Sequence, residues 1–413
     1  MDLDLIKSVL VKDFANFVDR GIFYYNEEDD PISAHLIALD GEKWKKLRAN
    51  LTPTFSSSKM KFMFPTMVEV GERLKDYLID VVKKNDELEI KDLMARLTID
   101  VIGTCLFGIE CNSLSDPNAE FRKYGKAVFE KPRHHPLIAV FLAGYRNIAR
   151  KLHIKNLRDD VSEFFMEVVR DTVEYREENN VNRNDFMDIL IKLKNEETND
   201  KDKILTLNVI AAQVFGFFVA GFDTSSTTLS YCLYELALNP EIQAKARRVI
   251  QEAFEKHGTF TYEMMLDMPY IEHVLQETLR KYPTASNLIR KTMNDYQVPG
   301  TNDVIQKGLS VIIPVFAIHR DSQYYPDPEQ FNPDRFDGEE AKQRNSLLWL
   351  PFGEGPRSCI AARFGMMQAR IGLVTILNSF EVSLCSKTVL TYEPKTLFLT
   401  PKGGLYLKFK AIK

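Results

Sequence analysis

Apolar residues recur at intervals of three and four along most of the chain, which is the spacing of helices with one buried face. This periodicity predicts helices over residues 65–83, 92–107, 156–178, 206–239, 241–257, 271–281 and 361–377. Segment 206–239 is largely apolar, so we expect it to be a helix in the core. Its longest apolar stretch, residues 209–221, contains Gln213 and is too short to cross a bilayer, so we expect no transmembrane span.

After Pro283 the helical periodicity gives way to short alternating runs, which predict strands. The candidate strands are residues 287–292, 304–306 and 309–313. The stretch 321–350 is rich in Pro, Asp, Asn and Gln and predicts irregular structure. Residues 390–410 alternate around the run from Pro401 to Gly404 and predict a hairpin. We therefore expect a mainly α fold with a small β portion.

The composition is that of an ordinary globular protein and excludes several classes. Hydrophobic residues make up 45% of the 413 residues and charged residues 27%. The net charge of -4 provides no global basic field, so we expect no nucleic-acid partner. The five cysteines are odd in number and widely spread, which argues against a disulfide scaffold or a zinc site and for a reducing compartment. Because no internal repeat or low-complexity block divides the chain, we expect one domain over residues 1–413.

Cys359 is the most informative residue of the sequence. It lies in the run Pro351 to Gly365, where a glycine-punctuated turn precedes it and an alanine-rich, helix-like segment follows. A turn that opens into a helix directs backbone N–H groups and the positive end of the helix dipole at the sulfur, which favours the thiolate. Such a thiolate can be a nucleophile or a metal ligand, and the alternative is a buried structural cysteine.

The run around Cys359 resembles the haem-binding loop of the cytochrome P450 family, Phe-x-x-Gly-x-Arg-x-Cys-x-Gly. Phe352, Gly355, Arg357 and Cys359 fall on this pattern, and Ala361 stands where the family usually has glycine. The resemblance implies haem b with Cys359 as the axial ligand of its iron, which favours O–O cleavage. It also implies that Phe352 packs beneath the porphyrin, that Gly355 permits the turn and that Arg357 pairs with a propionate.

Three further residues match positions at which the family holds haem propionates. Trp44 and Arg48 are one helical turn apart, and Arg290 lies in the β region. A separate set matches the buried ionic triad of the family, in which two arginines clamp one carboxylate. This set is Glu277, Arg280 and Arg335, and the resemblance implies that it fixes the irregular stretch beneath the haem loop.

The run Ala220 to Ser225 interrupts the apolar helix with residues that suit a buried helix poorly. It resembles the family motif on the oxygen side of haem, which implies that Gly221 leaves room beside the iron and that Asp223 and Thr224 relay protons. Thr224 is expected to bond back to the carbonyl of Ala220 and to bend the helix. The alternative is an acid paired with a neighbouring arginine and a threonine that caps a kink.

The resemblance implies a haem-thiolate monooxygenase of the animal microsomal type, closest to the insect xenobiotic-metabolising branch. It would insert one oxygen atom from O2 into an apolar small molecule, with electrons from NADPH-cytochrome P450 reductase and cytochrome b5 as a further candidate partner. Candidate pocket residues are Phe217, Phe218, Ala220 and Leu288. The rival functions are a haem-thiolate isomerase or dehydratase, a ligand-binding protein that does not use O2, and a non-catalytic fragment.

Microsomal members carry a membrane anchor and early sheet strands ahead of the position that matches Met1, so we expect an N-terminally incomplete cytochrome P450 domain. Localisation to the cytosolic face of the endoplasmic reticulum is implied by the family. Lysines near the Trp44 helix suggest a docking face for an electron donor, with an ordinary solvated face as the alternative. The apolar stretch 136–145 is a candidate for peripheral membrane contact, with a plain buried helix as the alternative.

Overall fold

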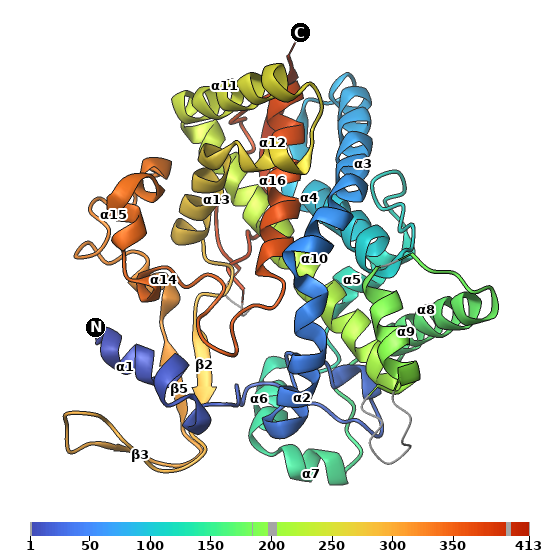
Figure 1. Ribbon diagram of the computed structural model, residues 1–413, viewed down its shortest axis with the longest axis vertical. Helices are drawn as coiled ribbons and strands as arrows, with labels where there is room; N and C mark the ends of the chain where they lie inside the picture. The colour runs from blue at the N-terminus through green and yellow to red at the C-terminus, as the bar shows by residue number, and fades with distance from the viewer. Residues whose placement is uncertain (1, 184, 197–204, 394–397, 413) are drawn as a thin grey trace.

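The computed structural model describes residues 2–183, 185–196, 205–393 and 398–412 (Figure 1). The longer helices are α3 (Ser57–Val82), α4 (Ile90–Ile102), α8 (Asp159–Glu178), α10 (Leu207–Leu238), α11 (Pro240–His257), α13 (Pro269–Lys281) and α16 (Ala362–Ser379). The shorter helices are α1 (Leu3–Lys7), α2 (Gly41–Leu51), α5 (Glu120–Glu130), α6 (Pro136–Gly144), α7 (Arg146–Lys151), α9 (Phe186–Glu196), α12 (Tyr262–Leu266), α14 (Val315–Ile318) and α15 (Gly338–Gln343). The mainly α fold class expected from the sequence is confirmed.

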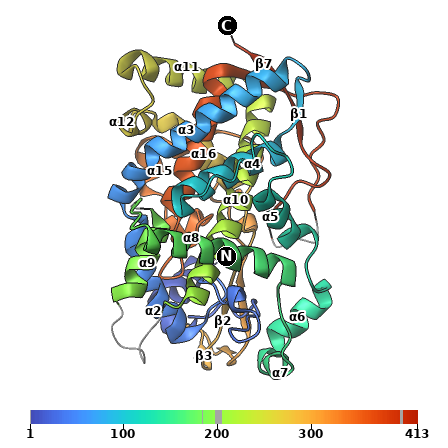
Figure 2. The same cartoon turned by 90° about the vertical axis from the view of Figure 1, so that its right-hand side faces the viewer.

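Helix α10 runs through the centre of the molecule, and α4 and α16 pack against it (Figures 1 and 2). By length and composition α10 is apolar enough to cross a membrane, but 56% of its most apolar 18-residue window is buried inside the protein. This is the environment of a core helix, in which the apolar surface is covered by other helices rather than by lipid.

The one amide in the apolar part of α10 fastens the segment that precedes α2. Gln213 accepts the backbone N–H of Leu36 at 2.9 Å and donates to the carbonyl of Val209 at 3.3 Å. One turn further along, Gly216 leaves space for His35, because a Cβ at position 216 would lie 2.7 Å from the Cβ of His35. The segment around His35 and Leu36 therefore lies directly on α10, beside the turn that carries Ala220.

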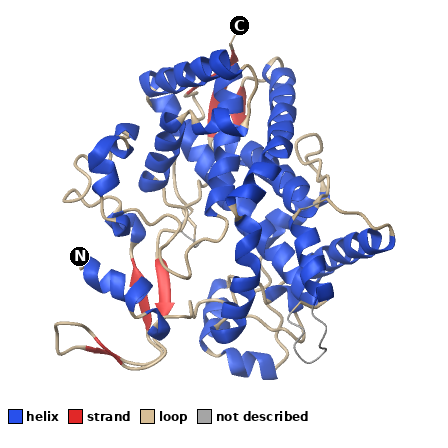
Figure 3. Ribbon diagram, in the orientation of Figure 1, coloured by secondary structure: helices blue, strands red, loops and turns tan. Residues whose placement is uncertain are grey.

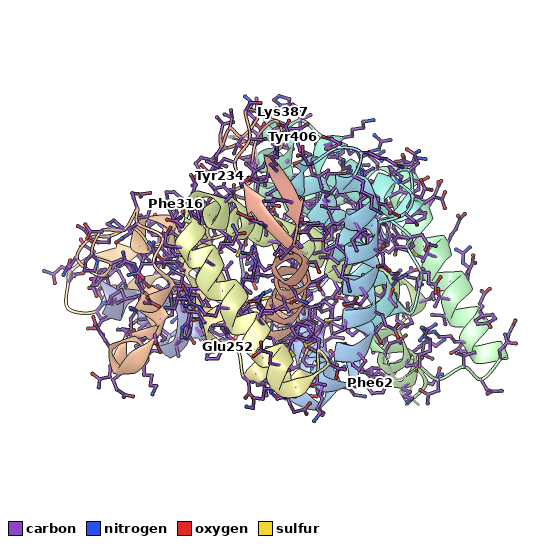
Figure 4. All side chains as sticks on the ribbon, turned by 90° about the horizontal axis from the view of Figure 1, so that it is seen from above. Phe62, Tyr234, Glu252, Phe316, Lys387 and Tyr406 are labelled. Atoms are coloured by element: carbon purple, nitrogen blue, oxygen red, sulfur yellow. The ribbon has the colours of Figure 1, made fainter. Side chains whose placement is uncertain are left out.

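Among the described residues the strands form three small sheets at the periphery (Figure 3). The strands are β1 (Glu87–Glu89), β2 (Leu288–Lys291), β3 (Tyr296–Gln297), β4 (Val304–Ile305), β5 (Ser310–Ile313), β6 (Phe380–Ser383) and β7 (Tyr406–Ala411). Strands β2 and β5 are antiparallel and place Arg290 opposite Val311. The three-stranded sheet has the order β1-β7-β6. In Figure 4, which views the molecule from above, Tyr406 of β7 lies beside Lys387.

The predicted hairpin over residues 390–410 differs from the structure, and four of its residues, 394–397, lie outside the described part. Strand β7 pairs with β6 and β1 instead of with the segment just before it. The described part of that segment pairs briefly with the chain before the glycines, through a bridge between Tyr392 and Pro401 and backbone hydrogen bonds from Glu393 to Thr400 and from Lys402 to Thr391. Gly403 and Gly404 have positive φ angles of 76° and 87°, so the chain turns there toward β1. The alternation of residues 390–410 does not indicate that β7 pairs with β1, which lies more than 300 positions earlier.

Two predicted helix boundaries also differ from the structure. Helix α3 begins at Ser57, eight positions before the predicted start, and Pro65 lies inside it. The segment predicted over 92–107 ends as an α-helix at Ile102 and continues as a π-helix over Gly103–Phe107. Gly103 is in close contact there, because a Cβ at this position would meet the sulfur of Cys111. Around Gly103 this close packing, which periodicity does not record, accompanies the change from α-helix to π-helix.

Candidate active site

The loop before α16 is closed by backbone hydrogen bonds and presents Cys359. The N–H of Cys359 donates to the carbonyl of Phe352 at 2.8 Å, and the N–H of Ser358 donates to the carbonyl of Gly355 at 3.0 Å. Gly355 has a φ of +74°, and a Cβ there would lie 2.0 Å from the carbonyl oxygen of Leu10. Both the conformation and the close approach of this backbone therefore require glycine at position 355.

The surroundings of Cys359 act on its thiol in two directions. Burial raises the pKa of Cys359 above its ordinary value, although the N–H of Ala361 and the charges of Arg48 and Arg20 act the other way. Cys359 retains accessible surface, so a ligand can reach it. The surrounding protein still excludes much of the solvent that would stabilise a thiolate. The turn and the arginines thus favour the thiolate as expected, but burial outweighs them, and a metal ion would have to displace the proton.

Ala361, the mismatch in the family pattern, has ordinary backbone geometry. Its φ is -101° and its ψ is 21°, a conformation that alanine adopts without strain. Its N–H also lies within hydrogen-bonding reach of the sulfur of Cys359. The methyl group that replaces the usual glycine hydrogen therefore leaves the loop conformation intact.

Arg357 lies at the centre of a group of buried and half-buried cations. Its guanidinium donates to the carbonyls of Val18 and Leu39, both at 2.9 Å, and lies 3.8 Å from the centre of the Trp44 ring. Its Nη1 is buried and has no hydrogen-bond partner among the described residues. The ring of Trp44, a residue expected to help hold a propionate, stacks against the guanidinium of Arg357.

Three more arginines lie in the same region. Arg290 on β2 is 2% exposed, and its buried Nε finds no partner in the described part of the chain. Arg48 on α2 donates to the carbonyl of Ser358 at 2.9 Å, which ties α2 to the cysteine loop. Arg20 donates to the carbonyl of Ile37 at 3.0 Å. We call Arg20, Arg48, Arg290 and Arg357 the arginine cluster.

The arginine cluster is short of negative charge. Burial, with the mutual repulsion of the arginines, lowers the pKa of Arg20 and of Arg290 to about 10 and that of Arg357 to about 9. Among the described residues, Asp19 is the one carboxylate within 4 Å of the cluster, and it lies 3.8 Å from Arg357. Buried charges are normally paired, so unpartnered N–H groups on such cations fit an anionic ligand. Haem b carries two propionates, and these residues fit it.

The predicted ionic triad is assembled on α13 and the irregular stretch. Arg280 donates from Nε and Nη2 to the two carboxylate oxygens of Glu277 at 2.6 and 2.9 Å, and both side chains are 0% exposed. Arg335 lies 3.4 Å from the same carboxylate, and the N–H of Asn332 donates to it at 2.9 Å. The clamp holds the irregular stretch to α13 through one buried negative charge.

His319 connects the triad to the cysteine loop. Its Nδ1 faces the carbonyl of Arg280 at 3.1 Å, and its Nε2 accepts the N–H of Leu350 at 2.8 Å. This pattern assigns the proton to Nδ1. Burial lowers the pKa of His319 to about 3, so the ring is neutral and has a structural place in the molecule.

Thr224 bonds back to its own helix, as the sequence predicts. Its Oγ1 donates to the carbonyl of Ala220 at 2.7 Å, while α10 continues unbroken through this turn. Gly221 differs from the expectation that it leaves room beside the iron. A Cβ at position 221 would lie 2.7 Å from Cδ1 of Ile102, so Gly221 allows α4 to approach.

The side chain of Asp223 points toward α4. Its Oδ1 accepts from Nζ of Lys91 at 2.7 Å, and Nζ also donates to the hydroxyl of Ser226 at 2.7 Å. The two charged side chains are 14% and 15% exposed. The acid therefore has a basic partner, but this partner is a lysine on another helix and not the arginine of the alternative interpretation.

The candidate pocket residues divide into two groups. Ala220 and Leu288 are half-buried, whereas Phe217 and Phe218 are 9% and 0% exposed. The ring of Phe217 packs against Phe55 at 5.2 Å, and Phe218 lies among aromatic rings of α5 and α8. The structure thus differs from the expectation for the two phenylalanines, because neighbouring helices cover a face of α10 that the sequence pattern left open.

Arg20 and Lys91 belong to this site, but no motif marks them in the sequence. Arg20 follows Asp19 in a short polar run before Gly21, which is an ordinary turn composition. Lys91 follows Glu89, the residue that caps α4, and a lysine in a first helical turn is mildly unfavourable next to the helix dipole. That local conflict is a sequence signal for Lys91, whereas the place of Arg20 in the site follows from the arginines that the fold brings beside it.

Removing the charge of Glu277 is expected to destabilise the protein strongly. Glu277→Gln leaves Arg280 and Arg335 without their carboxylate and should lower the free energy of unfolding by about 3–5 kcal/mol, measured by urea denaturation. The matched control is Glu329→Gln, which breaks a pair with Arg320 whose carboxylate is 72% exposed and should cost less than about 1 kcal/mol. Equal effects of the two substitutions would contradict the role of the triad.

Comparison with known proteins identifies the family. The family model described as Cytochrome P450 matches residues 1–409. Cytochrome P450 6A1 of Musca domestica is 47% identical over 421 aligned positions, which cover 100% of this chain and 82% of that protein. Cytochrome P450 6a8 and Cytochrome P450 6a2 of Drosophila melanogaster are 50% and 49% identical, and the alignments cover 100% of this chain and 83% and 84% of those proteins. The chain therefore belongs to the cytochrome P450 family of haem-thiolate monooxygenases, which use haem b.

Proposed function

We propose that this protein inserts one oxygen atom from O2 into an apolar small molecule, with haem b held by the arginine cluster and by Cys359. The observation that carries the proposal is the group of buried arginines with unpartnered N–H groups beside an accessible cysteine. When bound, haem supplies the iron at which O2 is reduced and its O–O bond is cleaved. The reaction consumes a C–H bond, O2, two electrons and two protons, and yields C–OH and water.

The residues of this chain have separate roles in the proposal. The thiolate of Cys359 would bind the haem iron, and the hydrogen bond from its N–H to the carbonyl of Phe352 holds its loop. Arg357 and Arg290 offer their unpartnered N–H groups to the propionates, and Trp44 fixes the plane of Arg357. Ala220 and Leu288 present half-buried apolar surface toward a substrate, which is consistent with an apolar compound such as a xenobiotic.

Proton delivery is assigned to Thr224 and Asp223. A threonine hydroxyl has one hydrogen to donate and two lone pairs that accept, so it can receive one proton while it passes on another. Thr224 already donates to the carbonyl of Ala220, which fixes its hydroxyl on the turn that carries the half-buried Ala220. Asp223, the adjacent carboxylate, lies at the solvent-accessible side of α10 and can take up protons from water.

An exposed basic face supports an electron donor of the flavoprotein type, with NADPH-cytochrome P450 reductase as the candidate and cytochrome b5 as a further one. Lys45 on α2 and Lys61 on α3 have side chains that are 71% and 61% exposed, and each lies beside a surface glutamate, Glu42 or Glu263. Phe62, labelled in Figure 4, is 55% exposed beside Lys61. A face that combines lysines with an exposed aromatic ring suits an acidic partner protein.

Helices α6 and α7 support peripheral contact with a membrane, for which we propose the cytosolic face of the endoplasmic reticulum. Leu137, Val140 and Leu152 are 75%, 72% and 63% exposed, and the basic residues Arg133 and Lys151 flank them. In α6 the structure buries only Leu142, which supports membrane contact over the alternative of a plain buried helix. Apolar side chains next to basic ones are the composition of an interfacial helix.

Cys359→Ser is expected to abolish the red-shifted Soret band of the reduced carbon monoxide complex, because a serine oxygen cannot replace the thiolate. The absorption spectrum of the purified, reduced protein measures this directly. Cys385→Ser, which changes a partly exposed thiol elsewhere, serves as the control and should keep the band. Retention of the band in Cys359→Ser would contradict the ligand assignment.

Thr224→Ala is expected to uncouple NADPH consumption from product formation by several-fold, with the surplus appearing as hydrogen peroxide. The ratio of NADPH consumed to product formed, together with the peroxide released, measures the effect. Thr228→Ala is the matched control, because Thr228 makes the same kind of bond one turn further along, at 2.9 Å to the carbonyl of Thr224. Coupling unchanged from the wild type in Thr224→Ala would count against the relay.

A further inference from the structure

The backbone of the turn of α10 that carries Asp223 accepts hydrogen bonds from several side chains. Four consecutive carbonyls, those of residues 220–223, each accept a side-chain hydrogen bond. The donors are Thr224 to residue 220 at 2.7 Å, Gln368 to residue 221 at 3.4 Å, Thr98 to residue 222 at 3.0 Å and Lys91 to residue 223 at 3.1 Å. Helical carbonyls can accept such bonds through their second lone pair. Because α4 and α16 supply three of the donors, the position of this turn depends on both helices.

Lys91 is the charged donor among these four, and it also contacts the carboxylate of Asp223. Its Nζ contacts the carbonyl of Asp223, the carboxylate of Asp223 at 2.7 Å and the hydroxyl of Ser226 at 2.7 Å. An ammonium group has three hydrogens, so these contacts use its full donor capacity. The ammonium group therefore fixes the carboxylate in one direction, and this geometry offsets the unfavourable position of a lysine in the first turn of α4.

The pair lies where the contact between α4 and α10 reaches solvent. The side chains of Lys91 and Asp223 are 15% and 14% exposed, so water has access to the carboxylate. Successive residues of a helix point about 100° apart, and the structure directs Asp223 to α4 while Thr224 is bonded to the carbonyl of Ala220. The carboxylate thus lies on the solvent side of the turn, and the hydroxyl lies on the face of Ala220.

We infer that Lys91 is a positioning residue for proton delivery, which holds the carboxylate of Asp223 at the solvent side of α10 as the uptake point for protons. The inference rests on the proposed relay through Asp223 and Thr224. Lys91 contributes no net proton: Asp223 takes one from water, passes it toward Thr224 and returns to the carboxylate, twice in each turnover. Without Lys91 the carboxylate loses its fixed direction and its counter-charge.

Lys91→Met tests the inference in the complete haem-loaded enzyme. We expect kcat to fall about tenfold, less than the roughly 10²–10⁴-fold that a proton-transfer group itself contributes, because Lys91 only positions the carboxylate. The dissociation constant from the substrate difference spectrum should stay unchanged. The ratio of kcat in H2O to kcat in D2O should rise, because proton uptake becomes slower than the other steps. Lys91→Arg, which keeps the charge, should recover about half of the wild-type kcat despite its different geometry.

Lys281→Met is the matched control. Lys281 of α13 forms a comparable pair with Glu235 of α10 at 2.9 Å, and the two side chains are 12% and 1% exposed. Glu235 lies twelve positions after Asp223, about 18 Å along the helix. We expect Lys281→Met to leave the solvent isotope ratio at the wild-type value. The same rise in Lys281→Met as in Lys91→Met would overturn the inference, because any broken buried pair would then suffice.

Thermal unfolding without substrate gives a readout independent of turnover. Lys91→Met and Asp223→Asn should each lower Tm, and the double variant should lose less than the sum of the two, which shows that the pair exists in solution. If Lys91→Met does not fold, Lys91→Gln keeps a hydrogen-bond donor and should show the same isotope effect. Wild-type kcat and isotope ratio in Lys91→Met would leave the pair purely structural and overturn the inference.

The failure of the inference differs from the failure of the proposed relay. If Asp223→Asn and Thr224→Ala keep wild-type coupling, the relay itself is wrong, and the role of Lys91 is overturned with it. If those two variants uncouple and Lys91→Met does not change kcat or the isotope ratio, the relay stands and only the role of Lys91 is overturned.

Discussion

The buried positive charge of the arginine cluster is the constraint on which the rest of this structure depends. Four guanidinium groups from four separate parts of the chain meet beside one cysteine, and burial lowers the pKa of three of them to about 9–10. Such a gathering is unfavourable unless an anion joins it. We infer that the two carboxylates of haem b complete it, and that α2, β2 and the loop before α16 are held together partly through that ligand.

The irregular stretch 321–350 leads into the cysteine loop, and its own position is fixed by buried polar contacts. Glu277 and Arg280 fix that chain to α13 with no exposure to solvent, and the neutral ring of His319 passes the connection on to Leu350. On the opposite side α10 is fastened by α4 and α16, so both sides of the site are set by buried polar contacts between elements far apart in the sequence. Buried polar contacts therefore hold the parts that position the chemistry, whereas apolar packing fills the space between them.

The sequence predicted the central helix, the long helices around it and the residues that carry fixed-spacing patterns, because helical period and turn chemistry are local properties. It failed where a distant partner decided the outcome. Strand β7 pairs with β1, Gly221 makes room for α4 rather than for the ligand, and Phe218 is covered by α5 and α8. The sequence does not predict the roles of Arg20 and Lys91 for the same reason, because these roles depend on which side chains the fold places beside them.

The most direct test of this account is a titration of the haem-free protein with haem b and with its dimethyl ester, followed by quenching of tryptophan fluorescence. The ester keeps the porphyrin and the iron but removes both propionate charges. We predict that the ester binds at least about tenfold more weakly, because charge-assisted hydrogen bonds contribute about 1.5–3 kcal/mol each. Equal affinity for the two compounds would contradict the claim that the arginine cluster is completed by the carboxylates of the cofactor.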